Sequence, residues 1–183
     1  MMPDRPAYLP GDPLPADEID RMIRVDQAGE YGAVRIYEGQ LAIVRRGRAR
    51  DEIRHMAEQE ARHLGRFNDL MHSRRVRPTL LQPLWHVAGY ALGAATALLG
   101  EEAAMACTVA VEEVIDEHYQ GQAERLGDAD PALKETILAF RDDELAHRAR
   151  AIEHGAMDTL GYDVVSGVIK AGSRFAIWLS TRI

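Results

Sequence analysis

The sequence has few residues for thiol chemistry and no excess of basic residues. Among its 183 residues there is one cysteine, Cys107, which excludes an internal disulfide and a thiolate cluster. Basic residues number 22 against 29 acids, for a formal net charge of −7, whereas a protein that binds nucleic acid presents a basic face. With 46% hydrophobic residues, the chain is long and apolar enough to bury the core of one domain.

Charged residues are also missing from one long segment. Residues 78–100 contain no Asp, Glu, Lys or Arg, although residues 43–77 hold ten arginines and residues 101–163 hold sixteen acids. Three glycines, a glutamine and a histidine dilute this segment, so it falls short of the ~20 apolar residues of a transmembrane helix. It predicts a helix in a membrane interface, with Trp85 and Tyr90 at the headgroups. Residues 164–181 also combine many apolar residues with a few cations, so they are a second candidate for a segment in the membrane interface. The alternative is that both segments pack against each other or against a partner subunit.

The pattern of the chain indicates a single helical domain after a short arm. Residues 1–16 contain five prolines and no apolar run, which predicts a flexible arm. From residue 17 to residue 183 apolar residues recur near every 3.6 positions, which is typical of helices. No pair of strands with turn chemistry between them is present, so the predicted fold is all-α. The predicted helices run from residue 17 to Gly47, from there to Arg77, over 101–126, from Pro131 to Gly155 or Gly161, and over 164–179.

Two predicted helices contain the pattern Glu-x-x-His on their apolar side. The pairs are Glu60 with His63 and Glu144 with His147, and residues three apart share one helix face. One such pair is most often a solvated surface pair, because glutamate is usually exposed. Two pairs on apolar faces are harder to explain in that way, because a buried charge is costly unless it is paired or binds a metal.

Each pair is preceded by a helix with its own glutamate on the apolar side. Glu30 lies thirty residues before Glu60, and Glu112 lies thirty-two residues before Glu144. Two such hairpins in an antiparallel bundle bring four carboxylates and two imidazoles together, which is the ligand set of di-iron and di-manganese bundles. These hard donors favour iron or manganese, and the lack of thiolates disfavours structural zinc. The predicted metal ligands are Glu30, Glu60, His63, Glu112, Glu144 and His147.

Three further residues are candidates for supporting this site. Asp143 and Gln59 each directly precede a predicted ligand glutamate. Each is expected either to orient a histidine of the other hairpin, as metal-bound histidines require, or to be a solvated helix residue. Tyr119 lies seven residues after Glu112 on the same face, and it is expected either to line a substrate cavity or to fill the core.

Several blocks of the sequence resemble the demethoxyubiquinone hydroxylases of ubiquinone biosynthesis. The blocks are DQAGEYGA (26–33), RVRPT (75–79), GAATALLG (93–100), AMACTVAVEE (104–113) and FRDDELAH (140–147). The resemblance extends from about residue 20 to the C-terminus. It implies a ferritin-like antiparallel four-helix bundle with two iron ions, which hydroxylates the demethoxyubiquinone ring with dioxygen and reducing equivalents from NADH to give demethylubiquinone. The ligands of that family fall on the six residues already named, with Glu60 and Glu144 as the expected bridging pair.

The resemblance also implies a peripheral membrane protein with a lipid-soluble quinone substrate. No mitochondrial-type presequence is evident, which favours the cytoplasmic face of a bacterial inner membrane. A homo-oligomer or a complex for ubiquinone biosynthesis is a further expectation. Two other classes stay open: another ferritin-like di-metal protein, such as a quinol oxidase, peroxidase or ferroxidase, and a non-enzymatic scaffold for a membrane complex.

Overall fold

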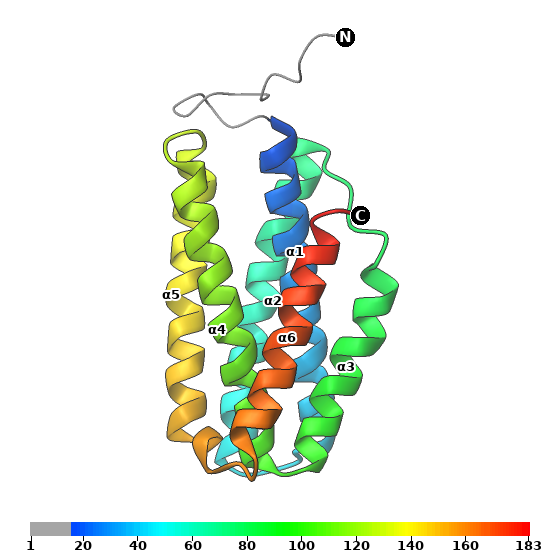
Figure 1. The fold of residues 1–183 in the computed structure, drawn as a ribbon, viewed down its shortest axis with the longest axis vertical. Coiled ribbons are helices and arrows are strands. Elements are labelled where there is room, and N and C mark those ends of the chain that lie inside the picture. Colours follow the sequence, from blue (N-terminus) through cyan, green and yellow to red (C-terminus); the bar gives the residue numbers. More distant parts are fainter. Residues whose placement is uncertain (1–15) are drawn as a thin grey trace.

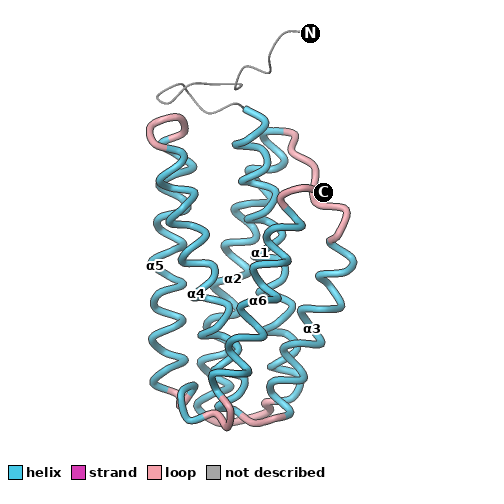
Figure 2. Tube along the Cα trace, viewed as in Figure 1, coloured by secondary structure: helices cyan, strands magenta, loops and turns pink. Residues whose placement is uncertain are grey.

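A computed structural model describes residues 16–183, so nearly all of the predicted flexible arm (1–16) lies outside the described residues. Within the described range every regular element is helical (Figure 2), which confirms the all-α prediction. The helices are α1 (Ala16–Ile43), α2 (Arg48–Arg74), α3 (Gln82–Leu98), α4 (Glu101–Leu126), α5 (Pro131–Glu153), the short 3-10 helix η1 (Ala156–Asp158) and α6 (Tyr162–Ser180).

Two antiparallel hairpins, α1–α2 and α4–α5, form a four-helix bundle (Figure 1). In this bundle α1 lies against α2 and α4, and α5 lies against α4 and α2. The long connection between the hairpins contains α3, which packs along part of α1, while α6 returns along α4. The two hydrophobic segments are thus additions to the outside of a bundle with one crossover connection, as in ferritin-like folds.

The helix ends follow the local chemistry of the chain. The helix α5 begins where predicted, because the Asp130 side chain accepts a hydrogen bond from a backbone N–H of the first turn, which caps the helix. The helix α1 ends at Ile43, and Gly47, with φ of 99°, instead precedes α2. The helix α2 ends at Arg74, earlier than predicted, because Arg75 adopts a left-handed conformation with φ of 57° and closes the last turn.

The helix α3 packs on α1 at a distance that only glycine allows. A Cβ atom on Gly93 would lie 1.9 Å from the carbonyl oxygen of Ile36, and one on Gly39 would lie 2.2 Å from that of Tyr90. The opposite face of α3 and its flanks stays exposed. The large hydrophobic side chains exposed on α3 and its flanks are Leu80, Leu84, Val87, Tyr90, Leu98 and Leu99. The uncharged segment thus packs through one face on α1 of the bundle, a partner that neither expectation named, and membrane contact of its exposed face stays a prediction.

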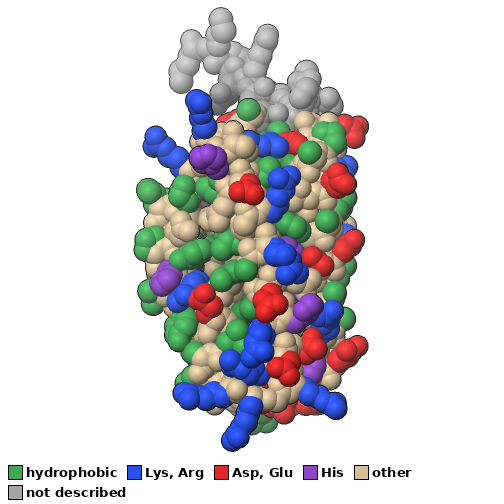
Figure 3. All heavy atoms as spheres, turned by 180° about the vertical axis from the view of Figure 1, so that it is seen from behind, with side chains coloured by type: hydrophobic (Ala, Val, Ile, Leu, Met, Phe, Trp, Pro, Cys, Tyr) green, Lys and Arg blue, Asp and Glu red, His purple; other side chains and the backbone are tan. Residues whose placement is uncertain are grey.

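The surface is unevenly divided between apolar and charged side chains. The helix α6 and the turn before it expose apolar residues as α3 does, among them Leu160, Val164, Val168, Phe175 and Trp178. Seen from behind, hydrophobic side chains are most frequent over the edge where α3 lies (Figure 3). In the described part of the chain, no helix combines the length and apolar character needed to cross a membrane.

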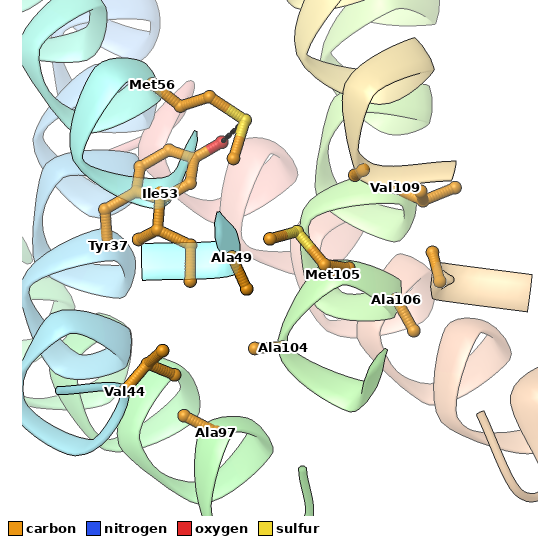
Figure 4. Close-up of a cluster of buried hydrophobic side chains, with 12 residues drawn as sticks. Tyr37, Val44, Ala49, Ile53, Met56, Ala97, Ala104, Met105, Ala106 and Val109 are labelled. Carbon is orange, nitrogen blue, oxygen red and sulfur yellow. Dashed lines mark hydrogen bonds between the residues drawn. The ribbon is translucent and has the colours of Figure 1, made fainter. Parts of the chain in front are cut away.

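The bundle interior has two hydrophobic clusters. One includes Tyr37, Ile53, Met56 and Met105 (Figure 4), and the other includes Phe67, Leu133 and Ile137. Along each of the four bundle helices, the predicted metal ligand lies between residues of the two clusters. The polar centre is thus enclosed by apolar side chains on both sides along the bundle axis.

Candidate metal centre

The six predicted ligands converge in the middle of the bundle, and none of them is more than 3% exposed. They form two groups in which one donor atom from each residue lies within 4.8 Å of all the others. The first group is Glu30, Glu60, His63 and Glu144, and the second group is Glu60, Glu112, Glu144 and His147. Glu60 and Glu144 belong to both groups, as expected of a bridging pair.

The inner nitrogen of each histidine faces the carboxylates. His63 Nδ1 lies 3.2 Å from an oxygen of Glu144 and 3.6 Å from an oxygen of Glu30. His147 Nδ1 lies 3.1 Å from an oxygen of Glu60 and 3.1 Å from an oxygen of Glu144. Both imidazoles therefore offer Nδ1 to a metal.

The outer nitrogen of each histidine meets a residue of the opposite hairpin. His63 Nε2 lies 3.0 Å from Asp143 Oδ2, and His147 Nε2 lies 3.2 Å from Gln59 Oε1. An imidazole that binds a metal through Nδ1 carries its hydrogen on Nε2, so it donates to these two acceptors. Asp143 and Gln59 thus occupy the orienting positions that were one of their two expected roles, although the Asp143 side chain also remains 43% exposed.

Two buried tyrosines hold the carboxylates that belong to only one group. The Tyr119 hydroxyl donates to Glu30 Oε1, and the Tyr37 hydroxyl donates to Glu112 Oε1 at 2.9 Å. Tyr37 also points toward the sulfur of Met56 (Figure 4). Tyr119 thus fills the core, one of its two expected roles, and its hydroxyl also contacts a predicted ligand. The role of Tyr37 was missed, yet a signal existed, because it follows Glu30 by the same seven residues.

A second polar cluster lies one helical turn before Glu30. The buried carboxylate of Asp26 accepts hydrogen bonds from His118 Nε2 at 3.1 Å and from Gln122 Nε2 at 2.8 Å. Burial raises the pKa of Asp26, and the contacts with His118 only partly offset that rise. Sequence reasoning missed this cluster because nothing in the local pattern links α1 to residues 92 positions away.

The electrostatics of the centre favour a cation. Burial, together with the charge of Glu144, raises the pKa of both Glu60 and Glu112 well above the usual value. Burial also raises the pKa of Glu144. Burial alone would lower the pKa of His63, but the nearby carboxylates of Glu144 and Glu30 raise it to about 10, whereas burial lowers the pKa of His147. Buried carboxylates this close cannot all be ionised without positive charge between them.

Two buried atoms that could bind a metal have no hydrogen-bond partner, which fits a site for metal ions. Glu60 Oε1 and His63 Nδ1 are buried and make no hydrogen bond of acceptable geometry, although other ligands lie close by. Such orphaned atoms are rare in protein interiors. Both atoms belong to residues whose donor atoms lie within 4.8 Å of one another, which is close enough for one cation to be shared.

An apolar cavity of about 420 Å³ lies beside the centre, between α1, α3, α4 and α6. Its wall includes Gly29 and Val111, which adjoin Glu30 and Glu112 in the sequence. No charged side chain lines it, and its only polar side chains besides the Trp85 indole are two serines. The indole N–H of Trp85 donates to the hydroxyl of Ser180 at 2.9 Å. The volume is in the range of small-molecule sites.

Comparisons with known proteins agree with this architecture. The family model described as ubiquinone biosynthesis protein COQ7 matches residues 17–180. A 3-demethoxyubiquinol 3-hydroxylase of Rhodospirillum rubrum is 59% identical over 176 residues, which covers 96% of this chain and 83% of the relative. The mitochondrial NADPH-dependent 3-demethoxyubiquinone 3-hydroxylase of Homo sapiens is 52% identical over 169 residues, which covers 90% of this chain and 78% of the relative.

A third relative is the mitochondrial 5-demethoxyubiquinone hydroxylase of Saccharomyces cerevisiae. It is 45% identical over 182 residues, and the match covers 90% of this chain and 78% of the relative. All three relatives are named as hydroxylases. The scaffold alternative is therefore wrong, because the chain is an enzyme. With the family model matching almost the whole described range, the chain belongs to the COQ7 family of ubiquinone biosynthesis proteins.

Proposed function

We propose that this chain is a di-iron monooxygenase that hydroxylates the ring of demethoxyubiquinone, in its quinone or quinol form, to give demethylubiquinone. One observation carries the proposal: two buried Glu/His groups that share Glu60 and Glu144 lie beside an apolar cavity. The names of the relatives supply the substrate, and the donor set supplies the metal, because carboxylates and imidazoles suit iron.

The ligands divide naturally between two iron ions. Glu30 and His63 would hold one ion, Glu112 and His147 would hold the other, and Glu60 and Glu144, which belong to both groups, would serve both. When bound, the two ions supply the activation of dioxygen, which no side chain of this chain can perform. The tyrosine hydroxyls keep the two terminal carboxylates in place, and the outer hydrogen bonds of the histidines fix their ring orientation.

The apolar cavity receives the quinone ring. Its wall excludes water and offers no charge, so it favours an uncharged aromatic ring over a hydrated metal ion or a sugar. A polyprenyl tail leaves between α3 and α6, where the exposed faces are apolar. This cavity also argues against a ferroxidase, whose substrate is a hydrated ion.

The reaction balances with two electrons from a reduced nicotinamide nucleotide. One atom of dioxygen enters a ring C–H bond as a hydroxyl group, and the other leaves as water after taking up the two electrons and two protons, one proton from the nicotinamide hydride and one from solvent. The sequence predicts NADH as the donor, while the name of the human relative specifies NADPH. We propose that NADH or NADPH is the ultimate source of the electrons, and parallel assays with both distinguish them.

We further propose that the protein lies on a membrane surface through the exposed apolar faces of α3 and α6. The cations Arg77 and Arg182 lie near the ends of these helices, where they suit phosphate headgroups. The cytoplasmic face of a bacterial inner membrane, and a homo-oligomer or biosynthetic complex as the assembled state, stay predictions from sequence.

The proposal is tested by metal content and product formation in one preparation. The purified chain is loaded with ferrous iron and incubated with a demethoxyubiquinol analogue, dioxygen and NADH, and the hydroxylated product is identified by mass. We expect about two iron ions per chain, as in other di-iron bundles. Glu144→Ala should lose both iron and product, whereas Glu58→Ala, an exposed glutamate of α2, should keep them. Full iron content and activity in Glu144→Ala would refute the ligand assignment.

A further inference from the structure

The proposed metal centre has an internal two-fold repeat, in which each hairpin supports the predicted ligands of the other. Tyr37 of the first hairpin donates to Glu112 of the second, and Tyr119 of the second donates to Glu30 of the first. The same exchange holds for the outer nitrogens of the histidines. Matched positions thus carry the same residue type in the terminal glutamates, the bridging glutamates, the histidines and the tyrosines.

The repeat breaks at the outer partners of the histidines. His63 Nε2 meets the carboxylate of Asp143 at 3.0 Å, while His147 Nε2 meets the neutral amide oxygen of Gln59 at 3.2 Å. Asp143 and Gln59 are equivalent in sequence, since each directly precedes the bridging glutamate of its helix. One imidazole therefore donates to a formal negative charge and the other does not.

This difference changes the electron density on the inner nitrogen. A hydrogen bond to an ionised acceptor is shorter and stronger than one to a neutral acceptor, and a carboxylate behind a histidine raises its basicity as a ligand. Asp26 lies on the same side, one turn from Glu30, but His118 is its hydrogen-bonded partner. The unequal pair of Asp143 and Gln59 is thus the contrast that acts directly on the ligand nitrogens.

We infer that the two metal positions are not equivalent, and that Asp143 and Gln59 are the positioning residues that distinguish them. The position of the first group, which contains His63, binds a divalent cation more tightly and stabilises the higher oxidation state of iron. The inference rests on the metal binding proposed above. Because partners of this kind typically change affinity by about 10-fold to 100-fold and Asp143 is partly exposed, we expect a difference near the lower end, about 10-fold.

The experiment titrates the metal-free full-length chain with Co²⁺ and follows the visible absorption of the bound ion. We expect two binding constants that differ by about 10-fold. Asp143→Asn keeps an acceptor but removes its charge, so it should weaken the tighter constant and leave the other unchanged. Gln59→Glu should strengthen the weaker constant. In the double variant the two binding constants should differ by about as much as in the wild type, but the tighter one should now belong to the position of His147.

The control is Asp142→Asn, which removes the same charge from the adjacent exposed residue of α5 and should change neither constant. If Asp143→Asn does not fold, as judged by circular dichroism, Gln59→Glu decides alone, because it removes no contact. In iron-loaded protein the two one-electron potentials should move closer together in Asp143→Asn by about 59 mV, the equivalent of a tenfold change.

Three outcomes would overturn the inference while leaving metal binding intact. These are equal constants in the wild type, an effect of Asp143→Asn no larger than that of Asp142→Asn, and a weakening of both constants by Gln59→Glu. A wild-type chain that binds no cobalt would instead refute the proposed metal site itself, so the two failures are distinguishable.

Discussion

At the scale of single residues, the centre depends on hydrogen bonds that hold its carboxylates as much as on the carboxylates themselves. Glu30 and Glu112 are each held by one tyrosine from the other hairpin. Without that donor a buried carboxylate is free to rotate, and part of its hydrogen-bonding capacity is unsatisfied. The contribution of these hydroxyls can be isolated because phenylalanine has the same ring.

We predict that Tyr119→Phe lowers the affinity for Co²⁺ by about 10-fold and leaves the fold intact. The ring keeps its place beside Phe67, with ring centroids 6.5 Å apart, while Glu30 loses its donor. The measurement is the cobalt titration together with a thermal unfolding curve. Tyr31→Phe is the control, because the Tyr31 hydroxyl meets His86 outside the metal site. Unchanged affinity in Tyr119→Phe would show that the hydroxyl does not hold the ligand.

The unusual pKa values predict how the metal-free protein responds to pH. The pKa of His63 is raised from 6.5 to about 10, and those of Glu60, Glu112 and Glu144 are raised above 4.5. A raised pKa means that the folded chain holds its proton more tightly, so the stability is lost as the pH rises through the folded value. The lowered pKa of His147 acts in the opposite sense, but only below 6.5.

The free energy of unfolding of the metal-free chain should therefore fall as the pH rises from 6.5 toward 10. Urea unfolding at a series of pH values measures it. His63→Gln should flatten the slope, and saturation with a divalent metal should abolish it, because the cation then compensates the carboxylates. A metal-free chain whose stability rises over this window would contradict the electrostatic account.

Spacing along the sequence was sufficient for the ligands and insufficient for some of their supports. The convergence of the six predicted ligands could be inferred from Glu-x-x-His pairs and matched intervals, because helical periodicity is local. Tyr37 could have been predicted in the same way, because it follows Glu30 by the seven residues that also separate Tyr119 from Glu112. Asp26 and His118 were not, since their contact depends on how α1 and α4 pack and leaves no trace in either helix alone.

At the scale of secondary-structure elements, α3 has two faces with different tasks. One face is made of glycines that fit against α1, and the other exposes apolar side chains. The sequence predicted the helix and its lack of charge, but it did not predict which face would pack on α1 and which would stay exposed. The division follows from glycines on both helices, such as Gly39 and Gly93, whose pairing across the interface requires the tertiary structure.

The close packing predicts that Gly93→Ala destabilises the protein by about 1–3 kcal/mol, as overpacking does elsewhere. The added Cβ would lie 1.9 Å from the carbonyl oxygen of Ile36, so α3 must move away from α1. Gly121→Ala is the matched control, because no atom lies within 4 Å of the new Cβ in α4. It should be neutral or stabilise by up to about 1 kcal/mol. Thermal unfolding of both variants tests the prediction, which fails if they behave alike.

The exposed apolar face predicts where the protein touches a membrane. Val87 is 65% exposed on α3, and Val87→Glu should weaken co-sedimentation with anionic phospholipid vesicles, because a charge would have to enter an apolar layer. Leu138→Glu adds the same charge to an exposed leucine of α5, on the other side of the bundle, and should have little effect. Equal loss in both variants would indicate that net charge alone governs vesicle binding.

At the scale of the whole molecule, metal binding at the proposed centre would be coupled to folding. The net charge of −7 includes four glutamates that lie inside the bundle, and these work against folding unless they are protonated or bind cations. A ligand that binds only the folded chain stabilises it by about 2.7 kcal/mol at a hundredfold excess over its dissociation constant.

Adding Co²⁺ to the metal-free chain should therefore raise its unfolding temperature by several degrees. Glu58→Ala should show the same increase as the wild type. Glu144→Ala should show much less, because Glu144 belongs to both groups. Differential scanning calorimetry measures the shift, and an equal shift in Glu144→Ala would mean that the metal stabilises the chain from another place.

Neither metal group is complete within one hairpin. The first takes Glu144 from the second hairpin, and the second takes Glu60 from the first. During synthesis a ribosome has therefore made three glutamates and a histidine of the centre before either position has its full set of donors. The donor set is complete only once His147 has emerged, with four-fifths of the chain already made. If the proposed centre holds iron, the metal can be inserted only late in synthesis, and a truncated product that ends before α5 would lack donors of both groups.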